Sequence, residues 1–252
     1  MAESFPPPTP PIPPQPPGKQ PPGTVPPPSF GVPPVPPPGP PLPWEQPGYP
    51  ALEALYETAK LFFTAPSQAF ARMSLTGTLG RPLLYAVIFG WLGTIAGQAY
   101  SLAFRGAIHG FLSSLPGYNA RLMTGMPAAA TAAIMILAPI LVLLGIFIWS
   151  AIVHLFLMLV GGANTGFAST VRVVSYTATV QILQVVPLCG GILTTIWGLV
   201  LQIIGLAIAH RTTQGRSALA VLLPPALCCV CLAIIGAAFG AAIAAAVGHF
   251  AR

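Results

Sequence analysis

Long apolar segments separated by short polar ones dominate the chain from residue 81 onwards. A helix that crosses the roughly 30 Å hydrocarbon core of a bilayer needs about 20 consecutive, mostly apolar residues. Five segments come close enough to that length, namely 82–104, 128–160, 168–186, 192–209 and 217–248. The pattern therefore predicts an all-α fold, a polytopic membrane helix bundle with five transmembrane helices. The second segment is the longest, and we expect one tilted helix there with a bend at Pro139.

A different spacing of apolar residues precedes these segments. Between residues 51 and 65 they recur every three or four positions, which is the period of an amphipathic helix. The apolar face consists of Leu52, Leu55, Tyr56, Ala59, Phe62 and Phe63. The charged residues on the other side are Glu53, Glu57 and Lys60. We expect an amphipathic interfacial helix region over residues 51–80, in which Pro66 ends the first helix and residues 67–73 form a second short one.

The first 50 residues hold 24 of the 32 prolines in the chain. Proline has no amide hydrogen and a fixed φ angle, so such a segment forms neither helix nor sheet. We expect residues 1–50 to be a disordered, proline-rich cytosolic tail that favours the polyproline II conformation. Residues 14–19 follow the pattern P-x-x-P-x-Lys, which suits an aromatic groove on a protein partner. So many prolines also produce this pattern by chance, and the tail then acts as a spacer.

The composition excludes an ordinary soluble protein. Ten Lys or Arg and four Asp or Glu make 14 charged residues among 252, whereas a soluble domain of this length carries about 60. Hydrophobic residues make up 54% of the chain, and a core of this size cannot hide so much apolar surface from water. We therefore expect residues 81–252 to form a membrane domain whose main partner is the lipid bilayer.

The basic residues indicate an orientation in the membrane. The net charge is +6, but these residues are isolated, so they suit anchors for anionic lipid better than a nucleic-acid surface. With the N-terminus in the cytoplasm, the inner side holds Lys60, Arg72, Arg81, Arg172, Arg211 and Arg216. The outer side holds Arg105, Arg121 and Arg252. Cytoplasmic loops carry an excess of Lys and Arg, so we expect a cytoplasmic N-terminus and an outer C-terminus.

The sequence contains few of the side chains that enzymes use for catalysis. The chain has no Asp, and its last acidic residue is Glu57. The predicted bundle can therefore hold no aspartyl pair, no glutamate base on a metal-binding helix and no carboxylate proton relay. The four cysteines lack metal-site spacing and read as small hydrophobes, namely Cys189, Cys228, Cys229 and Cys231. The sequence therefore predicts no enzyme, no cofactor and no metal.

Polar residues gather where the second predicted span turns into the third. One helical face of the third span carries Arg172, Ser175, Tyr176 and Thr179. A turn near Asn164 brings His154 level with Val174, so that His154 and Arg172 could share a pocket. This candidate cluster is a binding or relay site in one interpretation. In the other, Arg172 extends to lipid phosphates and His154 is a neutral packing residue, since only Glu53 and Glu57 are conceivable acidic partners.

The opposite face of the third span is polar as well, through Thr177, Gln181 and Gln184. A span that is polar on two faces belongs between neighbouring helices rather than in lipid. This feature keeps open a second class of function, a small channel or carrier that uses the third span.

The last predicted span contains a GxxxG pattern at Gly236 and Gly240. Small residues at this spacing let two helices approach closely in a membrane. The partner helix can belong to the same chain or to a second copy in an oligomer.

Several landmarks resemble the Yip1 domain family. Residues 64–70 read Thr-Ala-Pro-Ser-Gln-Ala-Phe, like the apolar, proline and phenylalanine pattern that precedes the first span in that family. The best match is a helix, Gly-Gly turn, Gly-Phe, Arg, Tyr order, made by residues 154–162, Gly166, Phe167, Arg172 and Tyr176. The match continues through Pro187, Gly190, Gly191, Ile196, Trp197 and residues 205–210. The resemblance covers about residues 51–248 and implies five membrane-spanning helices with a cytosolic N-terminus.

Eukaryotic members of that family engage small GTPases in vesicle trafficking and carry an Asp-Leu-Tyr-Gly-Pro motif before the first span. This chain has no Asp, so it resembles a prokaryotic-type member, and the resemblance implies a location in a bacterial cytoplasmic membrane. We therefore expect a non-enzymatic integral membrane protein that acts as a scaffold or adaptor and binds protein partners through its proline-rich tail. The alternative is the small channel or carrier described above.

Overall fold

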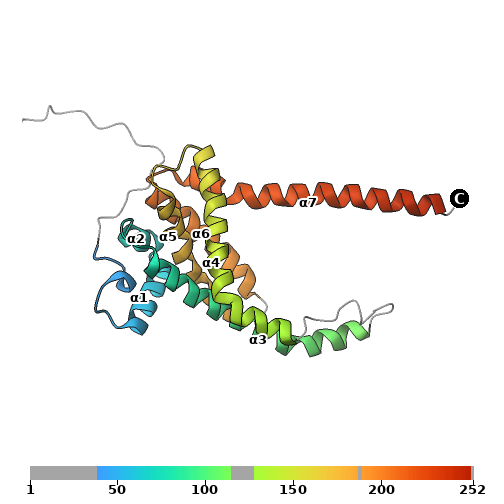
Figure 1. Ribbon diagram of the computed structural model, residues 1–252, viewed down its shortest axis with the longest axis horizontal. Coiled ribbons are helices and arrows are strands. Elements are labelled where there is room, and N and C mark those ends of the chain that lie inside the picture. The colour runs from blue at the N-terminus through green and yellow to red at the C-terminus, as the bar shows by residue number, and fades with distance from the viewer. Residues whose placement is uncertain (1–38, 115–127, 187–188, 251–252) are drawn as a thin grey trace, which may run out of the picture. The chain divides into compact units, whose positions relative to one another are not determined.

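The computed structural model describes residues 39–114, 128–186 and 189–250 (Figure 1). The disordered tail predicted for residues 1–50 thus lies outside the described residues up to residue 38. The elements are the 3₁₀ helix η1 (Pro43–Glu45), α1 (Ala51–Thr64), α2 (Pro66–Arg72), α3 (Gly80–Ser113), α4 (Ala128–Leu159), α5 (Phe167–Thr177), the 3₁₀ helix η3 (Ala178–Val185), α6 (Gly190–Ala209) and α7 (Gln214–Phe250). Over these residues the protein is all-α, as the sequence predicts.

Among the described residues, four helices are long and apolar enough to cross a membrane, namely α3, α4, α6 and α7. They correspond to four of the five predicted segments. The remaining segment, 168–186, folds as α5 followed directly by η3. Its backbone is helical throughout, but the change from α to 3₁₀ geometry at Ala178 divides it into two shorter elements.

The helix α3 is longer than the apolar segment 82–104 and continues past Arg105 to Ser113. The part of it that is apolar enough to cross a membrane is Gly80–Tyr100. Arginine is a good helix former, so a single charge marks the end of apolar composition without ending the helix. Residues 115–127 lie outside the described residues.

α5 occupies the centre of the bundle (Figure 1). It packs against α3, α4 and α6, and η3 packs against α3 and α6. Every residue from Ser169 to Thr177 is buried. Other helices surround this segment, so its side chains do not face lipid. The segment can therefore carry many polar side chains.

α1 and α2 pack on this bundle through aromatic rings. The Phe62 ring stacks on Tyr176 of α5 with 5.6 Å between ring centroids, and it meets Phe70 of α2 at 4.9 Å. The helix itself agrees with the prediction, but its buried face differs: Leu52 and Tyr56 are 83% and 64% exposed. The reason is that α1 is rotated about its axis so that the smaller Ala54, Thr58 and Ala59 face inward together with Phe62.

Residues just before the predicted boundary at residue 50 contact the helical bundle. Leu42, within the segment assigned to the proline-rich tail, is fully buried in the hydrophobic core. The Trp44 backbone amide donates a hydrogen bond to the Thr58 hydroxyl at 3.0 Å, and the Trp44 indole donates one to the Arg81 carbonyl oxygen at 2.8 Å. Proline content obscures these contacts in the sequence, because apolar and aromatic side chains are interspersed among the prolines.

α7 exposes a run of large apolar side chains. Its large side chains from Leu227 to Phe239 are exposed. At the GxxxG pattern, a Cβ atom added to Gly236 or Gly240 would meet no described atom within 4 Å. These glycines therefore do not mediate helix packing within the described chain.

Candidate functional site

The predicted polar face of the third span meets an acidic residue that the sequence places in the tail. The Tyr176 hydroxyl donates a hydrogen bond to Glu45 Oε1 at 2.8 Å, and the Ser74 backbone amide donates to Glu45 Oε2 at 2.8 Å. The Thr179 hydroxyl donates to the Tyr176 carbonyl oxygen at 2.8 Å. Because that bond uses the only proton of the Thr179 hydroxyl, Tyr85 is the donor in its 2.7 Å bond to Thr179 Oγ1.

Arg172 is buried, with 2% of its surface exposed. Its Nη2 atom donates to the Gly77 carbonyl oxygen at 2.5 Å, and its Nε atom has no partner among the described residues. The Arg172 side chain therefore lies inside the described bundle and meets a backbone carbonyl there. Arg172 does not pair with Glu53 or Glu57, since the single ion pair among the described residues joins Lys60 to Glu57 at 3.4 Å.

His154 belongs to a different set of polar contacts, on the other side of α5. Its Nδ1 atom lies 2.8 Å from the Thr170 hydroxyl, which lies 2.9 Å from His210 Nε2. The Thr165 hydroxyl lies 2.8 Å from His210 Nδ1, and the Thr165 backbone amide donates to that nitrogen at 3.3 Å. We call His154, Thr165, Thr170 and His210 the histidine cluster. The predicted pocket shared by His154 and Arg172 does not form, because Thr170 and Arg172 project from nearly opposite sides of the helix.

The backbone amide of Thr165 identifies the tautomers in this cluster. An amide can only donate, so His210 Nδ1 accepts and the His210 proton resides on Nε2. His210 Nε2 then donates to the Thr170 hydroxyl, which donates onward to His154 Nδ1. Burial, and secondarily the nearby His154, lowers the pKa of His210 to about 4. Both rings are therefore neutral in this arrangement.

The remaining predicted residues are separate from these contacts. Asn164 lies in the turn after α4 and donates through Nδ2 to the Arg211 carbonyl oxygen at 3.4 Å. The Ser175 hydroxyl is buried without a partner among the described residues. The six predicted residues therefore do not form one site, because they take part in separate hydrogen bonds. Three partners in these bonds were not among the predicted residues, namely Glu45, Thr170 and His210. The alternation of spans could have revealed His210, because it brings the turn after α4 and the turn after α6 to the same end of the bundle.

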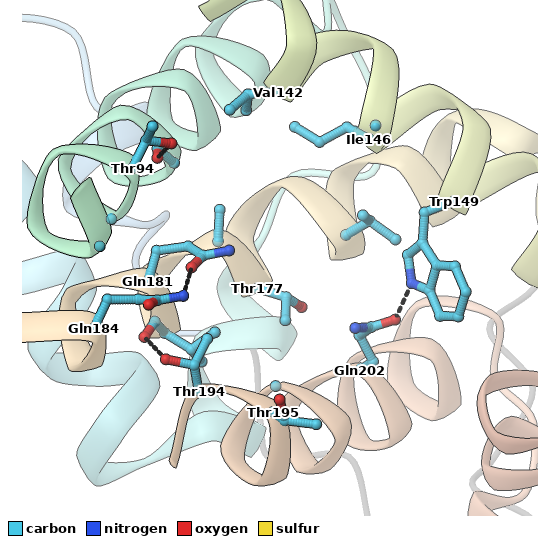
Figure 2. Close-up of a pocket in the computed structure, with 18 of the residues that line it drawn as sticks. Thr94, Val142, Ile146, Trp149, Thr177, Gln181, Gln184, Thr194, Thr195 and Gln202 are labelled. Carbon is cyan, nitrogen blue, oxygen red and sulfur yellow. Dashed lines mark hydrogen bonds between the residues drawn. The ribbon is translucent and has the colours of Figure 1, made fainter. Parts of the chain in front are cut away.

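A large cavity lies on the opposite face of the third span. It has a volume of about 960 Å³ and is lined by α3, α4, α5, η3 and α6. Figure 2 shows its polar side chains. The labelled polar residues are Thr94, Trp149, Thr177, Gln181, Gln184, Thr194, Thr195 and Gln202. Thr177, Gln181 and Gln184 form the second polar face that the sequence indicates, so this face is turned toward a cavity.

Two hydrogen bonds organise the amides of the cavity (Figure 2). The Trp149 indole donates to Gln202 Oε1 at 2.7 Å, linking α4 to α6. Gln184 Nε2 donates to Gln181 Oε1 at 3.3 Å. None of the described residues that line the cavity is charged, and no group of three or more metal-ligating side chains occurs in the described parts of the chain. The site can therefore offer hydrogen bonds to a ligand, but no charge.

These features define a polytopic helical membrane protein, whose apolar helices imply a lipid bilayer around them. The family model of the Yip1 domain matches residues 60–235, which is more than half of the chain. The protein therefore belongs to the Yip1 domain family, a membrane protein family that is not known for enzymes. No curated protein and no solved structure matches the chain.

Proposed function

We propose that this Yip1 domain protein spans the membrane five times and acts as a non-enzymatic scaffold or adaptor, with its proline-rich tail in the cytoplasm. The fifth span of this proposal is α5 together with η3. Eleven α-helical and eight 3₁₀ residues would rise about 32 Å, at about 1.5 and 2.0 Å per residue. That length matches a hydrocarbon core of about 30 Å.

The positions of the basic residues support the proposed orientation. Arg172 donates to Gly77, just before α3, and Arg216 Nη1 donates to Gly161, in the turn after α4, at 3.0 Å. These contacts bring the start of α3, the start of α5 and the turn before α7 to one end of the bundle. An excess of basic residues at one end favours the cytoplasmic side there.

The observation that carries the scaffold proposal is the docking of residues 42–46 on the bundle. Leu42 is buried, and Arg81 Nη1 donates to the carbonyl oxygens of Trp44 at 2.9 Å and Gln46 at 3.2 Å. The proline-rich segment therefore leaves the membrane domain from a fixed point. The proline motifs that precede this docked segment in the sequence suit cytoplasmic protein partners.

Proximity labelling in the native membrane tests the scaffold proposal. Three chains are compared: the full chain, a chain in which Gly/Ser repeats of equal length replace residues 2–38, and a chain that begins at Gly39 with an initiating Met. We expect a set of neighbouring proteins that the full chain labels and both altered chains lose. Identical neighbours for all three chains would contradict a role of the tail in partner binding.

The cavity favours a second candidate, the small channel or carrier. Its polar lining between helices is the kind of feature that a solute pathway requires. Flux of uncharged solutes into vesicles that contain the purified protein distinguishes the two functions. Transport above that of protein-free vesicles would support the carrier, whereas a pure scaffold gives none.

A further inference from the structure

We propose that the cavity between α3, α4, α5, η3 and α6 binds a neutral glycerolipid with a free hydroxyl group and ester carbonyls, in the manner of a diacylglycerol. This inference goes beyond the scaffold role and does not depend on it. The cavity volume of about 960 Å³ lies near the upper end of the roughly 300–1,000 Å³ that is usual for ligand sites.

The absence of charge selects the class of headgroup. The described lining residues include amides, hydroxyls and an indole but no Lys, Arg, Asp or Glu. A phosphate or ammonium group placed there would lose its hydration without gaining an opposite charge, which is strongly unfavourable in a membrane interior. An uncharged polar headgroup can be hydrogen-bonded by the same lining at little cost.

The threonines of the cavity supply acceptors. Their hydroxyls donate to backbone carbonyl oxygens, from Thr94 to Gly90, from Thr177 to Val173 and from Thr195 to Gly191, at 2.8 to 2.9 Å. Each of these oxygens has used its proton and keeps lone pairs for a donor. A free hydroxyl group on the ligand provides that donor.

The glutamines supply donors. An indole can only donate, so the bond from Trp149 identifies the Gln202 atom that it meets as the carbonyl oxygen and leaves the Gln202 amide NH₂ available. Gln98 also lines the cavity and has no hydrogen-bond partner among the described residues. Amide donors of this kind match the ester carbonyl oxygens of a glycerolipid. A ligand with both a hydroxyl group and ester groups therefore satisfies both sets of side chains.

The surroundings of the cavity favour a ligand with hydrocarbon chains. Next to the lining residues of α4, Leu141 and Ile148 are 50% and 60% exposed, and on α6 Ile192 and Ile196 are 63% and 56% exposed. Apolar side chains of this size on spanning helices face lipid. Acyl chains can therefore extend from the cavity along surfaces that already contact the bilayer.

Two substitutions should alter the cavity without disturbing the packing of the helices. Gly145 lines the cavity, and a Cβ atom added there meets nothing within 4 Å. Gly145→Leu therefore fills the cavity without a clash in the backbone. Gln98→Leu removes a donor that has no partner in the described structure. Gly191→Leu is the matched control, because Gly191 lies in α6 with equally open surroundings but does not line the cavity.

The test uses the full chain in vesicles with a diacylglycerol that carries a photoreactive diazirine in one acyl chain. A phosphatidic acid with the same chains and the same diazirine is the charged comparison. We expect the diacylglycerol to label peptides of α3 and α6 that line the cavity, with competition by unlabelled diacylglycerol. Labelling by the phosphatidic acid should be about tenfold weaker, since an unpaired charge is unfavourable there.

The variants test whether the labelling comes from lipid bound in the cavity. Gly145→Leu and Gln98→Leu should each lower cavity labelling at least about fivefold, through lost space and a lost hydrogen bond respectively. Gly191→Leu should leave it unchanged, and gel filtration should show all three variants folded. Equal labelling by the two lipids, labelling confined to peptides outside the cavity, or labelling insensitive to both Gly145→Leu and Gln98→Leu would each overturn the proposal.

Discussion

The phenol of Tyr176 holds a carboxylate that comes from another part of the chain. Glu45 receives one hydrogen bond from this hydroxyl and one from the Ser74 backbone amide. Loss of the phenol donor therefore leaves one carboxylate oxygen without its partner in a partly buried position. Bonds of this kind to a charged acceptor contribute about 1–3 kcal/mol.

Tyr176→Phe should accordingly destabilise the protein by about 1–2 kcal/mol. Thermal unfolding of the purified protein in detergent measures the change. Tyr56→Phe is the matched control, because Tyr56 is largely exposed and its hydroxyl makes no hydrogen bond in the described structure. An equal response of the two variants would mean that the Glu45 contact is not important for stability.

A substitution of the buried Arg172 gives a second prediction for a single residue. A buried guanidinium is less strongly hydrated than an ammonium group, so its replacement by lysine raises the cost of burial. We expect Arg172→Lys to destabilise the protein by about 1–3 kcal/mol in the same unfolding measurement. Arg216→Lys, at an exposed position, should change stability little. If neither variant changed stability, Arg172 would behave as the lipid anchor that the sequence first suggested.

The histidine cluster predicts how stability depends on pH. The folded-state pKa of His210 is about 4, whereas an unfolded histidine titrates near 6.5. Between these values the unfolded chain binds more protons, so stability is fully present above about pH 6.5 and is lost as pH falls towards 4. The loss should reach about 2–3 kcal/mol. Unfolding curves recorded from pH 7.5 to 4 should show this slope, and His210→Gln should flatten it; an unchanged slope would contradict the assignment.

Residue types and helical period could predict that Arg172, Ser175, Tyr176 and Thr179 share a face. They could not predict the partner of that face, because Glu45 is 131 residues from Tyr176 along the chain and lies among prolines. His210 is hard to predict for a similar reason. A single histidine after a span has no evident partner in the sequence unless the turns at one end of the bundle are first placed together.

At the scale of elements, the segment from Leu42 to Gln46 packs against the helical bundle. It contributes a buried leucine, the Trp44 contacts and the Glu45 bonds. The hydropathy pattern identified four spanning helices directly, and it also identified α5 with η3 as a helical segment. It could not show the change to 3₁₀ geometry or the rotation of α1, because both depend on contacts with neighbouring helices.

This assignment predicts different effects of two truncations. A chain that begins at Gly39 should unfold at the same temperature as the full chain. A chain that begins at Ala51 should still insert, but with a stability lower by about 3 kcal/mol or more, since it loses a buried leucine and several hydrogen bonds. Insertion is followed by membrane fractionation and stability by thermal unfolding in detergent. Equal stability of the two truncated chains would show that residues 39–50 do not contribute to the core.

At the scale of the whole molecule, the proposed topology requires α5 and η3 to cross the membrane as one unit. Their polar residues face other helices and the cavity rather than lipid, which reconciles a polar segment with a spanning position. The Yip1 domain match covers α5 and η3 together with the helices on both sides of them. On the proposed five-span topology, the N-terminus and the C-terminus lie on opposite sides of the membrane.

Labelling by a membrane-impermeant thiol reagent tests this claim most directly. In a chain with Cys228, Cys229 and Cys231 replaced by alanine, the exposed Cys189 immediately follows the α5–η3 segment. In a second chain, Cys189 is also replaced and Asn164→Cys provides the thiol immediately before α5. If α5 and η3 cross the membrane, the reagent should label Cys189 but not the thiol at position 164 in intact cells. In inside-out vesicles it should label the thiol at position 164 but not Cys189. Labelling of both positions from the same side would show that α5 and η3 do not cross the membrane.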